Sequence, residues 1–471
     1  MNVARSLLLA ILPACHGPDD DTAAAPVLAF PAGFEWGVAT SAFQVEGGAQ
    51  NDYSRWIDEG GPPPIGLACD SWNRWSEDLD LAADLGLDRY RLSIEWARLE
   101  PSEGTWDPDA LARYREMLEG VRARGLEPVV TLHHYTNPLW FADDGGWDDA
   151  RAPARFAAYA QYLAENLGDL VDDWNPQNEP MVYVAGLTLA GGYPGGSLND
   201  GERFFRVFDH YIASHAAAAG AIRAADTVDA DGDGENAAIW GVAAVSPTWP
   251  LDPDDPGSVE AARVYDEAYN HAWIRALVTG ELTFDPQSGV TEDRPELAGT
   301  LDVLGINYYS RAFIVPFDDT PLGGIPCSPP LVCGERNDLE GDNGNEVYPP
   351  GIYESIASMS RYGLPMFITE NGVADATDEV RPSFLLMHLL QVQRAVADGY
   401  DVGGYLHWSL LDNYEWLSGF EMRFGLYEVD FDTFARTPRP DSVGMYRRVI
   451  AENGIAQELI DAWDMPGIDP R

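Results

Sequence analysis

The chain has 471 residues, of which 45% are hydrophobic, and its 15 Trp and 21 Tyr supply ample apolar volume for a large core. Asp and Glu number 77 against 29 basic side chains, all of them arginine, so the net charge is −48. A surface of this sign repels phosphate backbones and acidic lipid headgroups, which excludes nucleic acid as a partner.

The first fifteen residues have the pattern of an export signal. Arg5 precedes an apolar run at residues 7–12 that is too short to span a bilayer. Leu12-Pro13-Ala14-Cys15 follows and is similar to a bacterial lipobox, with Cys15 as the residue that would carry a lipid anchor. We predict that residues 1–15 are a signal peptide with a candidate lipobox. The protein is then exported, as a cell-envelope lipoprotein or as a secreted protein. An ordinary secretory signal cut nearby and a misassigned start are the alternatives.

Residues 16–29 are predicted to form a tether in solvent. They contain the acidic run Asp19-Asp20-Asp21 and the alanine run Ala23-Ala24-Ala25. Such a composition favours a solvated segment over a packed one. The folded domain is therefore expected to cover residues 30–471.

Eight short apolar or β-branched runs are predicted to be strands, with amphipathic stretches between them. The predicted strands cover residues 34–40, 89–96, 128–134, 174–179, 238–245, 303–309, 366–370 and 404–410. Three sets of residues at helical spacing mark helix faces: Leu111, Tyr114, Leu118 and Val121; Phe204, Phe208, Tyr211 and Ile212; Phe384, Met387, His388 and Gln391.

Strands that alternate with helices form a parallel sheet, and eight such units indicate a closed (β/α)8 TIM barrel, an α/β fold. A simple prior of about 150 residues per domain suggests three domains. However, such barrels extend to over about 400 residues as one unit, and no linker is evident after residue 30. We predict a single domain.

Glu179 and Glu370 are the candidate catalytic residues. They end the fourth and the seventh predicted strands, and the catalytic groups of such barrels lie at the C-terminal ends of strands. Burying a charge there is costly unless the charge has a function. Two carboxylates that meet in space can divide acid/base from nucleophilic work, as bond cleavage at a sugar requires.

The segment Asp229-Ala230-Asp231-Gly232-Asp233-Gly234-Glu235 resembles the start of a calcium loop, with Gly234 at the turn position. The closing position is Trp240 rather than Glu, and no paired helix follows. An acidic surface loop is the favoured interpretation, so no metal site is predicted.

Cys327 and Cys333 flank a proline-rich segment and, in an exported protein, indicate a small disulfide. Metal binding is the weaker interpretation, because no second pair of ligands lies nearby. Cys69 is expected to be a buried or free thiol.

Six motifs resemble, in order, those of glycoside hydrolase family 1, and together they cover the chain from residue 34 to about 450. They are Ser41-Ala42-Phe43-Gln44-Val45-Glu46-Gly47, Arg91-Leu92-Ser93-Ile94-Glu95-Trp96, Asn178-Glu179-Pro180, Asn307-Tyr308-Tyr309, Thr369-Glu370-Asn371-Gly372 and Trp408-Ser409-Leu410-Leu411-Asp412-Asn413-Tyr414-Glu415-Trp416. The segment 418–426 is most similar to the archaeal-type branch of that family.

The resemblance implies a role for each matching residue. Glu179 would be the general acid/base and Glu370 the nucleophile. Arg91 would pair with Glu370, and Tyr309 would donate a hydrogen bond to it. The residues implied to hold the sugar are Gln44, His134, Asn178, Asn307, Tyr309, Trp408, Glu415 and Trp416. Taken singly, Trp408 would fit a core position and Glu415 a solvated charge, so these roles depend on the motifs occurring together.

Three residues depart from the family pattern. Pro176 stands where Thr is common, and Tyr135 and Thr136 stand where Trp and Asp are common. These departures concern the +1 subsite and the setting of Glu179. They leave the aglycone preference open.

The sequence therefore predicts a retaining β-glycosidase that removes terminal non-reducing β-D-glucosyl residues from small β-glycosides or oligosaccharides. No cofactor is predicted, and the oligomeric state stays open. A β-galactosidase, a β-fucosidase or a transglycosylase on the same site is the first alternative. The second is a catalytically dead carbohydrate-binding barrel, against which the presence of both carboxylates argues.

Overall fold

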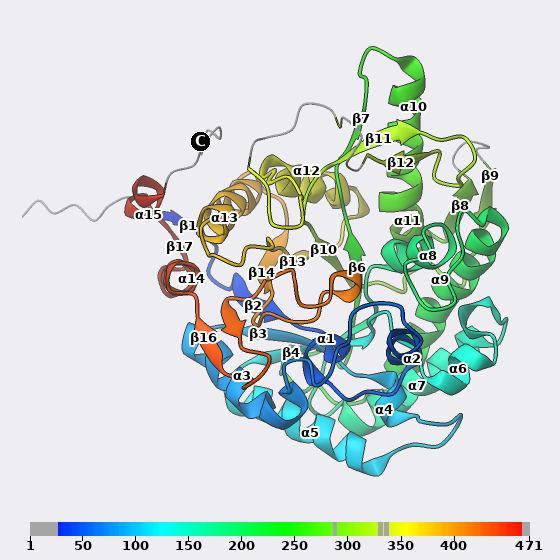
Figure 1. The fold of residues 1–471 in the computed structure, drawn as a ribbon, viewed down its shortest axis with the longest axis horizontal. Coiled ribbons are helices and arrows are strands. Elements are labelled where there is room, and N and C mark those ends of the chain that lie inside the picture. Colours follow the sequence, from blue (N-terminus) through cyan, green and yellow to red (C-terminus); the bar gives the residue numbers. More distant parts are fainter. Residues whose placement is uncertain (1–26, 286–289, 328–332, 334–338, 464–471) are drawn as a thin grey trace, which may run out of the picture.

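Eight parallel strands close into a barrel at the centre of the computed structural model, which describes residues 27–285, 290–327, 333 and 339–463 (Figure 1). Around the barrel the order is β10-β13-β14-β2-β3-β4-β5-β6, and β6 pairs with β10. The barrel strands are β2 Glu35–Ala39, β3 Arg89–Ser93, β4 Glu127–His133, β5 Asp173–Gln177, β6 Ala238–Ala244, β10 Val303–Asn307, β13 Met366–Glu370 and β14 Val402–Trp408. The predicted (β/α)8 fold is confirmed.

All eight predicted strands are present, but several end earlier than predicted. The strand β3 ends at Ser93 because the chain turns there into α4 (Trp96–Leu99), whose first turn is capped by the Glu95 side chain. The strand β5 ends at Gln177, and Glu179 takes a left-handed backbone conformation (φ 45°) before α8 begins. Several predicted strands were therefore too long, because they included candidate functional residues that lie just after the last residue of the observed strand.

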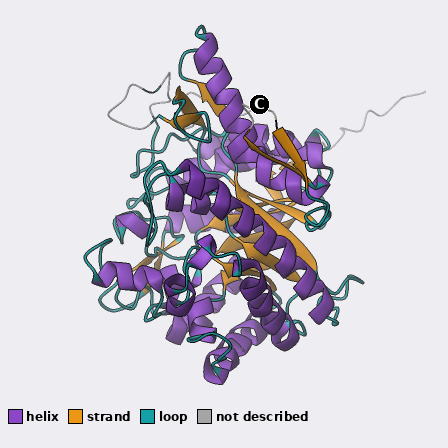
Figure 2. Cartoon of the chain, turned by 90° about the vertical axis from the view of Figure 1, so that its right-hand side faces the viewer, coloured by secondary structure: helices purple, strands orange, loops and turns teal. Residues whose placement is uncertain are grey.

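Helices enclose the barrel, so the strands run through the middle of the molecule with helices around them (Figure 2). They are α1 Ala42–Glu46, α2 Asp52–Asp58, α3 Ser71–Leu85, α4 Trp96–Leu99, α5 Pro108–Ala123, α6 Leu139–Asp143, α7 Ala152–Leu167, α8 Pro180–Thr188, α9 Gly201–Ala225, α10 Pro256–Tyr265, α11 Ala272–Thr279, α12 Pro350–Met359, α13 Arg381–Ala397, α14 Pro440–Glu452 and α15 Gln457–Ala462. Shorter helical turns are the 3₁₀ helices η1 Gly146–Asp148, η3 Ser360–Tyr362 and η4 Trp416–Ser418 and the π-helix η2 Asp266–His271.

Helix α5 shows how local sequence forms this outer layer. Asp107 precedes it and accepts hydrogen bonds from two backbone N–H groups of the first turn, at 2.8 and 3.1 Å. Tyr114, Leu118 and Val121 are buried against the core, and Leu111 is half-buried beside them. The predicted face is confirmed, and the faces predicted on α9 and α13 are buried in the same way.

The N-terminal end of the barrel is closed by charge and aromatic rings. Arg89 begins β3, pairs with Glu35 at 2.5 Å and with Asp173, and lies over the rings of Trp240 and Phe367. Because Glu35 and Asp173 also begin their strands, this cluster lies at the end of the barrel opposite Glu179 and Glu370.

The folded unit begins earlier than the predicted boundary at residue 30. Val27–Ala29 form β1, which pairs antiparallel with β17 Gly454–Ala456 (Figure 1). Composition assigned these residues to the tether, but their backbone groups are satisfied by β17 while the side chains of Val27 and Leu28 stay exposed. The predicted signal peptide, Cys15 and the rest of the tether lie outside the described residues.

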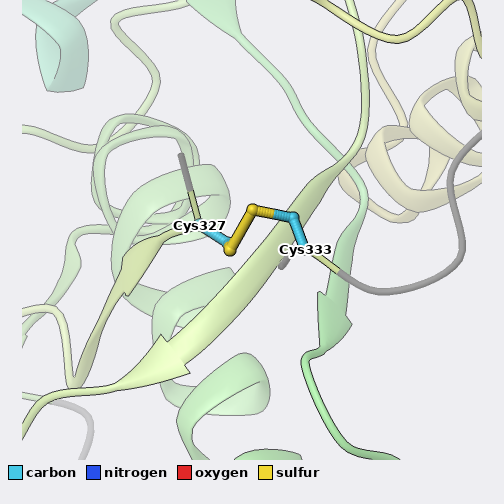
Figure 3. The surroundings of a disulfide bond; sticks show 2 residues. All are labelled: Cys327 and Cys333. Atoms are coloured by element: carbon cyan, nitrogen blue, oxygen red, sulfur yellow. A yellow bond between two sulfur atoms is a disulfide. The ribbon is translucent and has the colours of Figure 1, made fainter. Parts of the chain in front are cut away.

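A small subdomain extends from the barrel where α10 packs on β7, β11 and β12 (Figure 1). The predicted disulfide between Cys327 and Cys333 is present after β12, with a Cα–Cα distance of 5.6 Å (Figure 3).

Cys69 is buried, and its thiol donates to the carbonyl oxygen of Asp412. Strands outside the barrel are β1 and β17, β7 Thr248–Pro250, β8 Glu281–Asp285, β9 Val290–Asp293, β11 Ala312–Pro316, β12 Gly324–Pro326, β15 Tyr427–Val429 and β16 Arg436–Pro438.

The acidic loop before β6 is closed by its own hydrogen bonds. The Asp229 carboxylate accepts from the N–H groups of Gly232 and Gly234, and buried Asp172 accepts from those of Ala230 and Asp231. One oxygen each of Asp172, Asp229 and Asp231 lies within 4.8 Å of the others, whereas Asp233 is not in this group. Among the described helices, none is long and apolar enough to cross a membrane.

Candidate active site

Arg91 lies at the centre of the site and joins three barrel strands. It is fully buried on β3, where Nη1 donates to Oε1 of Glu370 at 2.5 Å and Nη2 donates to Oδ1 of Asn178 at 2.6 Å. Tyr309, just after β10, donates from its hydroxyl to Oε2 of Glu370 at 2.7 Å. Both oxygens of Glu370 therefore face donors, one of them a cation, as suits a negative charge.

Glu179 lies between β5 and α8 and is 8% exposed. Its Oε1 accepts from Nδ2 of Asn307 at 2.8 Å, and its Oε2 accepts from the hydroxyl of Tyr135. The side chain of Thr369 donates to Oδ1 of Asn307 at 2.7 Å, which fixes the orientation of that amide. Asn307 pairs with Glu370 in the β10–β13 ladder, so one residue connects the surroundings of the two glutamates.

The two carboxyl groups have opposite electrostatic settings. Burial and the negative charge of Glu370 raise the pKa of Glu179 to about 7, against the hydrogen bonds from Tyr135 and Asn307 and the charge of Arg91. Glu370, in contrast, is paired directly with the Arg91 guanidinium. The site therefore holds one carboxyl group whose pKa is raised to about 7 and one carboxyl group that is paired directly with a guanidinium.

Asn178 and His134 connect Arg91 to the aromatic rings of Trp408 and Trp416. Nδ2 of Asn178 is 3.3 Å from Nε2 of His134, and burial and the charge of Arg91 hold the pKa of His134 well below its usual value. The neutral imidazole lies parallel to the rings of Trp408 and Trp416, at 6.1 Å from each. Nδ1 of His134 is buried and has no hydrogen-bond partner among the described residues.

Gln44, Trp408 and Glu415 are the remaining predicted residues of the site. Nε2 of Gln44 donates to Oδ1 of Asn413 at 3.0 Å, while its Oε1 has no partner among the described residues. Nε1 of Trp408 donates to Oε1 of Glu415 at 3.3 Å. Burial and the charges of Glu370 and Asp412 raise the pKa of Glu415. Every residue that the sequence singled out thus lies on one network of ring and hydrogen-bond contacts at the C-terminal end of the barrel.

Tyr135 and Thr369 have contacts in the site that the sequence did not assign to them. Tyr135 appeared only as a departure from the family pattern, yet it contacts Glu179 directly. Its neighbour Thr136 donates to Glu95 at 2.8 Å instead. Pro176 has no N–H to donate, and the β5–β6 ladder has only two residue pairs, both before Pro176. The backbone N–H of Glu179 nevertheless donates to the carbonyl oxygen of Val242 at 2.9 Å. Of the three departures, only Tyr135 contacts Glu179 through its side chain in the described structure.

Comparison with known proteins gives consistent matches over almost the whole chain. The sequence pattern described as "Glycosyl hydrolase family 1" matches residues 27–455. A curated β-galactosidase of Pyrococcus woesei is 33% identical, over 91% of this chain and 98% of its own. The β-glucosidase A of Thermotoga maritima is 31% identical, over 90% and 98%. A solved β-glycosidase from Pyrococcus horikoshii superposes with a TM-score of 0.84 at 33% identity, over 94% and 99% of the two chains.

Arg91→Met should strongly destabilise the fold, because it leaves Glu370 charged and buried without its partner. We expect a loss of about 3–5 kcal/mol in the free energy of unfolding, measured by urea denaturation. Arg55→Met, which removes a more exposed ion pair with Asp143, should cost at most about 1 kcal/mol. The double variant Arg91→Met/Glu370→Gln should recover part of the loss. If the double variant is as unstable as the sum of its single changes, the buried charge is not the cause.

Proposed function

Because the chain belongs to glycosyl hydrolase family 1 and is a β-glycosidase, we propose that it hydrolyses terminal non-reducing β-D-glucosyl residues by double displacement. The unequal setting of its two glutamates supports this mechanism. Two carboxyl groups in unequal environments can divide the acid and nucleophile roles. Glu179, with its raised pKa, is the general acid/base, and Glu370, paired with Arg91, is the nucleophile.

In the first step, Glu370 attacks the anomeric carbon while the bond to the leaving oxygen breaks. Glu179 gives its proton to that oxygen, and the sugar becomes esterified to Glu370. In the second step, Glu179, now ionised, takes a proton from water. The water attacks the anomeric carbon and Glu370 leaves. Two inversions at one carbon give net retention.

The polar and aromatic groups around the glutamates support binding of one sugar ring. Asn178, held by Arg91, is proposed to contact the 2-hydroxyl. The unpaired acceptor of Gln44 and the free nitrogen of His134 suit further hydroxyls. The Trp408–Glu415 pair and the face of Trp416 complete the wall, since sugars combine a polar edge with an apolar face. A solved β-glucosidase from Thermotoga maritima, 28% identical with a TM-score of 0.82, is a complex with the sugar-like deoxynojirimycin.

The relatives also support one rival within the same chemistry. Both β-galactosidases and β-glucosidases match this chain at similar identity, so β-galactosides are the second candidate substrates. A dead carbohydrate-binding barrel is disfavoured, because both candidate catalytic carboxyl groups are present, Glu370 paired with Arg91 and Glu179 hydrogen-bonded to Asn307.

Retention is tested by proton NMR of the first sugar released from an aryl β-glucoside, which should be the β-anomer. An α-anomer formed first would falsify the double-displacement mechanism. Spectra are recorded immediately after mixing, before the released sugar mutarotates.

The division of roles is tested by removing each glutamate. Glu370→Gly should lose hydrolysis of all substrates by at least about 10⁴-fold, and azide should rescue it with formation of the α-glycosyl azide. Glu179→Ala should retain the first step for substrates with good leaving groups, because these need little protonation, and azide should then give the β-azide. The same azide anomer from both variants would contradict the assignment.

The sugar preference is tested by kcat/KM for matched aryl β-glucoside, β-galactoside, β-fucoside and β-glucoside 6-phosphate. We expect the glucoside to be preferred among the neutral sugars. The phosphate should be the poorest substrate, because the side chain offered at the sugar-binding wall is the carboxyl group of Glu415 rather than a cation, and the chain has no lysine to pair with a buried phosphate. A preference for the phosphate would overturn the position given to Glu415.

We also propose that the protein is exported and that Cys15 is the lipidated first residue of the mature chain. The apolar run followed by Leu-Pro-Ala-Cys supports this proposal. Mass spectrometry of the N-terminus after expression in a bacterial host should show a diacylglyceryl cysteine. An unmodified mature start downstream of Cys15 would show an ordinary secreted protein instead.

A further inference from the structure

We propose that Tyr135 is a positioning residue for Glu179. The hydroxyl of Tyr135 fixes one carboxyl oxygen of Glu179 and favours release of the Glu179 proton during catalysis. The proposal rests on the acid/base role proposed for Glu179. It concerns a residue that departs from the family pattern, which commonly has Trp at this position, so it is a property of this chain.

The hydroxyl of Tyr135 is buried and has two defined partners. It donates to Oε2 of Glu179 and accepts from Nδ2 of Asn178 at 3.0 Å. Nδ2 can only donate, because Oδ1 of the same amide accepts from Arg91 at 2.6 Å. With its own oxygen facing a donor, the single hydroxyl hydrogen of Tyr135 points to Glu179.

These hydrogen bonds form one directed series from Arg91 through Asn178 and Tyr135 to Glu179. Each donor polarises the next, so the last hydrogen bond is strengthened by the cation at the start. Arg91 thus touches Glu370 directly and reaches Glu179 through two neutral groups.

The Tyr135 ring is placed independently of its hydroxyl. The backbone takes a left-handed conformation at φ 76°, and the ring packs against those of Tyr183, Tyr193 and Trp416. Removing the hydroxyl alone should therefore leave the ring in place. This separates an effect on Glu179 from an effect on packing.

The direction of the effect follows from the groups that face Glu179. The groups that face it are Glu370, Arg91, Tyr135, Asn307, Tyr193, Tyr269 and Tyr309. Burial and Glu370 favour the neutral acid, whereas the hydrogen bonds from Tyr135 and Asn307 and the charge of Arg91 favour the carboxylate. Loss of the Tyr135 hydroxyl should thus raise the pKa of Glu179, so that the acid stays protonated to higher pH.

The test is the pH dependence of kcat/KM for Tyr135→Phe with a β-glucoside that has a poor leaving group. The alkaline limb should move to higher pH by about one unit, since a hydrogen bond to a charged group is worth roughly that much. With a dinitrophenyl glucoside, which needs no proton from Glu179, the profile should be unchanged. A purely structural role would lower both rates without moving the limb.

Tyr183→Phe is the matched control. It removes a hydroxyl from the same ring cluster, but that hydroxyl accepts from Asn137 and has no contact with Glu179. Its alkaline limb should coincide with that of the wild type. Tyr135→Leu supplies a second variant whose side chain has no hydrogen-bond donor, for use if Tyr135→Phe fails to fold, and it should move the limb in the same direction.

An unmoved limb in both Tyr135 variants, or an equal shift in Tyr183→Phe, would overturn the role of Tyr135. These outcomes differ from a failure of the proposed function. In that case the wild-type enzyme itself would fail to hydrolyse the β-glucoside, or its alkaline limb would persist with the dinitrophenyl substrate.

Discussion

The arrangement of the site depends on the hydrogen bonds of the buried Arg91 guanidinium. This guanidinium is fully buried, and it pairs with Glu370 from β13 and with Asn178 after β5. A cation without solvent is tolerated only where its partners are fixed, so the barrel must hold three strands in register for this pair to form. The same cluster then fixes the orientation of the Asn178 amide, whose Nδ2 donates to the hydroxyl oxygen of Tyr135. One buried charge thus orders both sides of the site.

The proposed chemistry follows from the different contacts that the two glutamates make, because only Glu370 is paired directly with Arg91. Glu370 receives the cation directly together with a hydroxyl from Tyr309, whereas Glu179 receives two neutral donors and the repulsion of Glu370. An acid that must both give and take a proton works best with a pKa close to the working pH. Burial alone would push Glu179 further toward the neutral form, and Tyr135, Asn307 and Arg91 oppose that push.

Tyr135 illustrates why a departure from a family pattern deserves a structural explanation. From its residue type it could have altered the aglycone side, the setting of Glu179 or neither. The structure brings its hydroxyl to the acid/base, while the adjacent Thr136 turns to Glu95. Substitutions at these two neighbouring positions therefore have different consequences, since one side chain contacts Glu179 and the other contacts Glu95.

The sequence by itself determined the barrel and the location of the two glutamates, because strand and helix periodicity is local and the C-terminal strand ends of a barrel meet at one place. The disulfide of the two cysteines that flank the proline-rich segment was likewise predicted from the sequence, and the structure contains it. Only the tertiary structure decided that Val27–Ala29 join the fold, since their partner strand lies at the other end of the chain. The same holds for the orientation of Asn307 by Thr369 and for the contact of Tyr135 with Glu179. Those hydrogen bonds join residues on, or just after, different barrel strands, and no local sequence pattern predicts which of these side chains will meet in the closed barrel.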